Sequence, residues 1–102
     1  MRIRIITFNL NVPSEAYDQL TAEKAAEFAE WPGLIAKWWL GDTETGVYGG
    51  VYLFTSREDA DRSRETELHR SILTSPALKN VAVHEYDVLS APTSVTSPAS
   101  LV

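Results

Sequence analysis

Cysteine is absent from this sequence. Disulfide bonds, thiolate metal sites and a cysteine nucleophile are therefore excluded. Long apolar runs are absent as well, since no stretch approaches the roughly 18 residues that a membrane-spanning helix needs. The alternating first stretch, MRIRIITFNLNV, is not typical of a signal peptide. We therefore expect a cytoplasmic protein with no membrane partner.

Positive charge is scarce. The sequence has 9 Lys and Arg against 14 Asp and Glu, which gives a net charge of −5. Its basic residues are also scattered along the chain. Proteins that bind nucleic acid need clustered Lys and Arg to contact phosphate groups. We therefore expect no nucleic-acid partner.

Motifs that bind cofactors or metals are missing too. There is no glycine-rich phosphate loop, and the only histidines, His69 and His84, fall on different predicted elements. Glu65 and His69 have the spacing of neighbours on a helix face. A single pair is weak evidence, because metal sites need three or more converging ligands. The sequence therefore predicts no metal site and no bound cofactor.

What the sequence does contain is a hairpin around which the rest of the chain is organised. Two apolar runs, near residues 34–40 and 47–55, flank a polar loop from Gly41 to Gly46, which is typical of a β-hairpin. In the first run, the adjacent Trp38 and Trp39 must point to opposite sides of the sheet. Each buries a large area, so both faces should be covered. A second subunit is the simplest cover for the face without helices.

Two features of the hairpin have two interpretations each. Lys37, which shares a strand face with Trp39, is expected at a solvated edge, with a cation–π contact as the alternative. The pair Gly49-Gly50 is expected to mark a β-bulge. Room for a ligand above the missing side chains is the alternative there.

The remaining elements follow in a regular order. A strand near residues 2–12 precedes a helix that stops near 30–31. After the hairpin come a helix capped at Ser56, a helical turn near 69–75 and a strand near 81–89. The order β-α-β-β-α-β is that of the ferredoxin-like α+β fold, with a four-stranded antiparallel sheet. We expect one domain over residues 1–90. The Ser/Thr/Pro-rich tail, 91–102, would be disordered alone and could drape across a partner.

Several short segments carry a family resemblance. They are Phe8-Asn9-Leu10-Asn11-Val12-Pro13, Pro32-Gly33-Leu34 with Lys37 and Trp39, Gly49-Gly50-Val51-Tyr52-Leu53-Phe54-Thr55, and Tyr86-Asp87-Val88. Together they resemble the YdhR-like monooxygenases of the dimeric α+β barrel superfamily, over roughly residues 2–89. The resemblance implies a homodimer whose two sheets face each other, with a pocket between each sheet and its own helices.

A flat apolar ligand suits the residues present, because many aromatic side chains are accompanied by few hydrogen-bonding groups. Together with the resemblance, this predicts a cofactor-independent monooxygenase that oxidises a small aromatic substrate, such as a phenol, a quinol or an anthrone-like molecule. Two alternatives stay open. One is a non-catalytic homodimer that binds a small apolar ligand, and the other is an isomerase or cyclase on the same barrel.

The predicted site residues follow from this chemistry. His69 or His84 is the predicted base, because an unperturbed histidine titrates near a pH of about 6.5. Asn9 or Asn11, together with Tyr52, would donate hydrogen bonds to the substrate oxyanion. Turn chemistry at the strand end is the other interpretation of the two asparagines. The substrate-binding set is completed by three aromatic residues: Trp38, Trp39 and Phe54.

The sequence departs from one branch of the superfamily. Haem-degrading relatives use an asparagine, a tryptophan on the second helix and a histidine close after it. Here Arg62, Ser63 and Arg64 occupy the corresponding region, which has no tryptophan. We therefore do not expect haem degradation.

Overall fold

Four antiparallel strands and four helices make up the computed structural model, which describes residues 1–97. The strands are β1 (Arg2–Leu10), β2 (Leu34–Asp42), β3 (Val47–Phe54) and β4 (Leu78–Asp87). The helices are α1 (Ser14–Ala29), α2 (Arg57–Ser63), α3 (Glu67–Thr74) and α4 (Ser90–Thr96). One sheet holds the strands in the order β2-β3-β1-β4. This arrangement confirms the predicted ferredoxin-like α+β fold.

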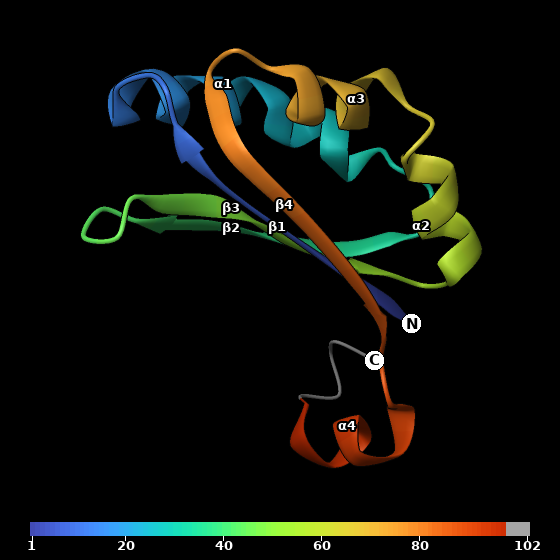
Figure 1. Cartoon of the computed structure of the whole chain (residues 1–102). Coiled ribbons are helices and arrows are strands. Elements are labelled where there is room, and N and C mark those ends of the chain that lie inside the picture. The colour runs from blue at the N-terminus through green and yellow to red at the C-terminus, as the bar shows by residue number, and fades with distance from the viewer. Residues whose placement is uncertain (98–102) are drawn as a thin grey trace.

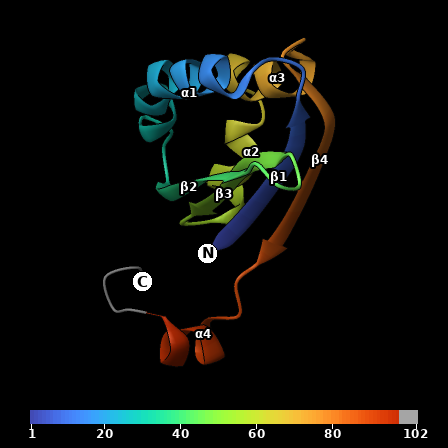
Figure 2. The same cartoon turned by 90° about the vertical axis from the view of Figure 1, so that its left-hand side faces the viewer.

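The helices are divided unevenly between the two sides of the sheet. Figure 1 shows α1 and α3 over one face, here called the inner face, with α2 at its edge. The short α4 lies on the opposite side, beyond what we call the outer face, and the turned view in Figure 2 shows the same division. Over residues 1–97, no helix has the length and apolar character needed to cross a bilayer.

Local signals explain where several helices begin. Ser56 caps α2 as predicted, since its Oγ accepts a hydrogen bond from the backbone N–H of Asp59 at 3.1 Å. Thr66 caps α3 in the same way, with its Oγ1 3.2 Å from the backbone N of His69. The first part of the predicted tail forms α4, with Pro92 in the first turn, where a missing N–H costs little. The rest of the predicted tail, 98–102, lies outside the described residues.

The strand register decides which hairpin side chains face the helices. In the β2–β3 pair, Trp39 lies opposite Gly50 and Lys37 opposite Tyr52, whereas Trp38 belongs to the alternate set. Tyr52 is part of the core under the helices, so Lys37 and Trp39 also point to the inner face. Trp38 points to the outer face. The prediction that the two tryptophans point to opposite sides is confirmed.

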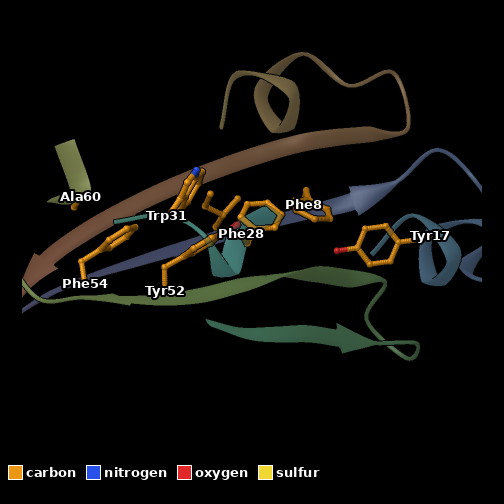
Figure 3. Packing of buried hydrophobic residues seen from close by; sticks show 8 residues of the cluster. Phe8, Tyr17, Phe28, Trp31, Tyr52, Phe54 and Ala60 are labelled. Carbon is orange, nitrogen blue, oxygen red and sulfur yellow. The ribbon is translucent and has the colours of Figure 1, made fainter. Parts of the chain in front are cut away.

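The core lies between the inner face and the helices. Trp31 stacks on Phe54 with ring centroids 6.2 Å apart, and Phe28 meets Trp31 edge-on at 5.0 Å. Figure 3 shows Tyr52 and Phe54 side by side on β3, pointing towards these rings. The buried cluster consists of Ile6, Phe8, Tyr17, Phe28, Trp31, Tyr52, Phe54 and Ala60. Its members from β1, Ile6 and Phe8, lie on the face of that strand that points to the helices.

Gly49 allows β3 to pack closely against β1. Its φ is +154°, and a Cβ atom at this position would lie 1.9 Å from the carbonyl oxygen of Ile6. The pairing of the two strands runs through Gly49 and Gly50 without a shift, so the predicted bulge is wrong. The glycine is explained by the close approach of the neighbouring backbone.

The outer face exposes large apolar side chains. Trp38 is 43% exposed and Tyr86 is 54% exposed. The register places Tyr86 opposite Ile3, which alternates with the buried Ile6 and therefore points outwards. The outer face thus carries aromatic surface that is not covered within the described part of the chain.

Candidate functional site

A pocket lies between the inner face and helices α1 and α3. Its volume is about 380 Å³, which falls within the range of roughly 300–1,000 Å³ typical of small-molecule sites. Residues of all four strands line it from the sheet side, β4 through Leu78 alone, and α1 and α3 supply its walls. Its principal apolar lining residues are Phe8, Phe28, Trp39, Tyr52, Leu68 and Ile72. A mostly apolar ligand therefore suits this lining.

Lys37 is the most unusual residue of the pocket lining. Its Nζ lies 3.3 Å from the ring centroid of Trp39, 3.4 Å from that of Phe28 and 4.6 Å from that of Tyr52. We call these three rings the Lys37 cage. The structure therefore shows the cation–π contact and not the expected solvated edge. Burial lowers the pKa of Lys37 to about 7, so the neutral amine is well populated at physiological pH.

Lys37 also lacks a carboxylate partner within the described chain. Lys24, at the rim of the pocket, forms an ion pair with Glu27 at 3.6 Å. Lys37 takes part in none of the ion pairs formed within residues 1–97. Within residues 1–97, the favourable contacts of its charge are therefore with the faces of aromatic rings.

Gly50 makes room for the Lys37 side chain. A Cβ atom at Gly50 would lie 3.0 Å from Cε of Lys37 and 3.3 Å from the ring of Tyr52. Because Gly50 faces Trp39 across the β2–β3 pair, its missing side chain lets the lysine lie across the strand. Gly50, the second glycine of the Gly49-Gly50 pair, thus leaves room in the pocket for a protein side chain, that of Lys37.

Two tyrosine hydroxyls belong to the same lining. Burial raises the pKa of Tyr17 to about 12, and burial also raises the pKa of Tyr52 well above its ordinary value. Both phenols therefore stay protonated at neutral pH and can donate a hydrogen bond. Figure 3 shows the hydroxyl of Tyr17 directed towards the middle of the aromatic cluster. The pocket thus combines the amine of Lys37 with two neutral phenol groups, in addition to Lys24 at its rim.

The structure brings two of the predicted site residues into the pocket. Trp39 and Tyr52 both line it. Phe54 is fully buried and stacks on Tyr52 with centroids 6.4 Å apart, so it supports the lining from behind. Trp38 and His84 lie on the outer face, where His84 stacks on Tyr86. These two side chains are therefore separated from the pocket by the sheet.

The two asparagines that were predicted as site residues, Asn9 and Asn11, form hydrogen bonds to neighbouring turns and loops. Nδ2 of Asn9 donates to the carbonyl of Gly46 at 2.8 Å, and its Oδ1 accepts from Asn80 at 2.9 Å. Nδ2 of Asn11 donates to the carbonyl of Pro76 at 3.2 Å. Neither asparagine belongs to the pocket lining, and their hydrogen bonds agree with the turn interpretation. Their role as oxyanion donors stays a prediction.

His69 is buried beside a cluster of charged groups outside the pocket lining. Arg4, fully buried, donates from Nε to Glu85 Oε2 at 2.9 Å, and Arg64 donates to the same oxygen at 2.7 Å. Burial, together with the neighbouring Arg4 and Arg64 and against the opposing effect of Glu85, lowers the pKa of His69 to about 4. His69 is therefore neutral at pH 7 and a weak base. Its catalytic role also stays a prediction.

Sequence reasoning did not select Lys37 or Tyr17 for the site. The available signal was the alternation that places Lys37 on the same strand face as Trp39, with two glycines on the next strand. For Tyr17 the signal was that the first helix carries two aromatic residues, Tyr17 and Phe28. No group of three His, Cys, Asp or Glu side chains that could hold a metal ion occurs in the described part of the chain.

Comparison with known proteins identifies a family model and related structures. The model of the family described as "Putative mono-oxygenase ydhR" matches residues 3–99. No curated protein matches the sequence significantly.

Among solved structures, SnoaB, a cofactor-independent oxygenase from Streptomyces nogalater, superposes with a TM-score of 0.69 at 16% identity, over 85% of this chain and 91% of that chain. A "Putative antibiotic biosynthesis monooxygenase" from Nitrosomonas europaea gives 0.71 at 17% identity, over 87% and 99%. A MhuD mutant with two manganese protoporphyrin IX molecules per active site gives 0.69 at 14%, over 87% and 95%. At these identities the likeness shows a shared fold.

Proposed function

The chain belongs to the YdhR mono-oxygenase family, and on that premise we propose that it oxidises a small aromatic substrate with dioxygen and without a bound cofactor. The observation that carries this proposal is the aromatic pocket of about 380 Å³ between the sheet and helices α1 and α3. Its ring-lined walls match a flat substrate such as a phenol, a quinol or an anthrone. SnoaB, a structural neighbour of the chain, is a cofactor-independent oxygenase.

The proposed reaction uses the substrate as the source of electrons. Loss of a proton gives a substrate anion, which passes one electron to dioxygen, and the two radicals combine to a peroxide. For an anthrone, protonation and loss of water then give the quinone, so one oxygen atom enters the product and the other leaves as water. The pocket supports these steps by its mostly apolar lining and by offering the hydroxyls of Tyr17 and Tyr52 to the anion.

Oxygen uptake with a panel of phenols, quinols and anthrones tests this function. Ile72→Trp places a large ring in the pocket lining, and we expect it to lower kcat/KM by at least about tenfold. Leu73→Trp is the matched control, because Leu73 is the next residue of α3, is 49% exposed and is not part of the lining. We expect it to leave the rate unchanged.

Other outcomes of the same experiment would contradict the proposed function and favour a different one. Product formation without oxygen consumption would assign an isomerase or cyclase. Binding of the aromatic compounds without any product would assign a ligand-binding protein. Equal rates in Ile72→Trp and Leu73→Trp would show that the reaction does not take place in this pocket.

We also propose that the chain acts as a homodimer whose outer faces meet. The support is the exposed aromatic surface of that face, above all Trp38 and Tyr86. A second depression of about 290 Å³ on the same side is lined by Trp38, Leu53 and Thr93, among others. Apolar area of this kind is typical of a subunit interface.

A further inference from the structure

The pocket contains an amine with no assigned task. Lys37 comes from the middle of β2 and points to the inner face, where its Nζ lies within 4.6 Å of the centroids of all three cage rings. No ion pair within residues 1–97 holds it. A lysine placed only for solubility would extend into water, because an ammonium group is strongly hydrated. Its position against the pocket therefore calls for a chemical explanation.

The surroundings of Lys37 are built to hold it there. Gly50 leaves the space that Cε occupies, since any Cβ would lie 3.0 Å away. The rings of Phe28, Trp39 and Tyr52 come from α1, β2 and β3, so three elements fix the position of one amine. Precise placement by independent elements is what a reacting group needs.

We propose that Lys37 is the proton acceptor of the pocket, and that its neutral amine removes the proton of a bound phenolic hydroxyl or of a comparably acidic ring carbon. This rests on the proposed function, because it needs an acidic aromatic ligand. The O–H or C–H bond breaks, a new N–H bond forms on Nζ, and the electron pair stays on the substrate. Dioxygen, the oxidant of the overall reaction, takes no part in this step.

The cage stabilises the product of that proton transfer. The ammonium group formed on Nζ lies over three ring faces, which attract a cation. The substrate anion lies beside it in an apolar site, where opposite charges attract more strongly than in water. A pKa of Lys37 near 7 also suits the task, because a general base works best when its pKa is near the working pH.

Titration of para-nitrophenol bound to the protein tests the acceptor without turnover, since its phenolate has a separate absorption band. In the wild type, we expect the bound phenol to ionise at a lower pH than in water, because the anion forms beside an ammonium group. In Lys37→Met, we expect it to ionise at a higher pH than in water, because an apolar pocket favours the neutral form. The two proteins should differ by at least about tenfold in the ionisation constant.

The control for this titration is Lys79→Met, which removes an exposed lysine of β4 outside the pocket lining. It should match the wild type. Equal ionisation in the wild type and in Lys37→Met would overturn the Lys37 proposal and leave the proposed function standing. Failure of the phenol to bind any of the three proteins would count against both.

Oxygen uptake separates proton acceptance from a purely electrostatic role. Lys37→Met and Lys37→Arg should both lower kcat by about 100-fold or more, because arginine keeps the charge but cannot accept the proton. The wild-type rate should rise with pH through about 7, as Lys37 loses its proton. A rate for Lys37→Arg within a few fold of the wild type would overturn the proposal, as would a rate without this pH dependence.

Discussion

At the scale of single residues, burial sets the protonation states on the helix side of the sheet. Burial lowers the pKa of Lys37 to about 7, and it raises the pKa values of Tyr17 and Tyr52, so both phenols stay protonated. His69 is held neutral by a pKa lowered to about 4. These side chains lie on four different elements, but each responds to the same loss of solvent.

His69 gives a prediction for stability against pH. Its folded pKa of about 4 lies below the unfolded value of about 6.5. Between these values the unfolded chain binds more protons, so stability falls as the pH drops through that window. The advantage of the wild type over His69→Gln should therefore shrink by roughly 1–3 kcal/mol between pH 7 and pH 4. Urea denaturation at several pH values measures this.

The comparison isolates one group among several that titrate in acid. Hydrogen bonds from Arg64 and Arg4 lower the pKa of Glu85 against the opposing effect of burial, and both proteins share this carboxylate. A constant difference between the two proteins from pH 7 to pH 4 would mean that His69 has the same pKa in the folded and unfolded states.

At the scale of elements, the alternation along β2 was enough to predict that Trp38 and Trp39 point to opposite sides of the sheet, but not which of them faces the helices. It was not enough to place Lys37 in a ring cage, because Phe28 comes from α1 and the space comes from Gly50 on β3. In the same way, the polar sequence of α3 did not reveal that His69 is its buried residue. Fold class could be predicted from periodicity, whereas the site depends on contacts between elements.

The contact between β3 and β2 at Gly50 therefore gives a prediction about the position of Lys37. Gly50→Ala should displace Cε of Lys37, because the new Cβ would lie 3.0 Å from it. We expect kcat/KM to fall by about tenfold and its pH midpoint to shift, since the environment of the amine changes. Gly41→Ala is the matched control, because its Cβ would crowd the ring of Tyr48 at 3.1 Å instead. An unchanged pH midpoint in Gly50→Ala would show that the glycine does not position Lys37.

At the scale of the whole molecule, the two faces of the sheet have different tasks. The inner face carries the core and the pocket, and its rings are packed by α1 and α3. The outer face carries Trp38 and Tyr86, both more than a third exposed. The sequence already indicated a sheet with apolar residues on both faces. It could not indicate that α4 would lie on the outer side, because that placement depends on packing beyond the domain predicted for residues 1–90.

Trp38→Glu tests the proposed pairing of outer faces. If two copies meet there, the substitution buries an unpaired carboxylate, which costs several kcal/mol. The dissociation constant of the dimer should then rise by on the order of 100-fold or more, and light scattering should show a monomer at micromolar concentration. Leu73→Glu on α3, which is exposed on the helix side, should stay dimeric. Circular dichroism should be the same for both variants, because neither residue belongs to the core. A monomeric wild type would contradict the proposed dimer. A Trp38→Glu variant that remains dimeric would show that the subunits meet at another surface.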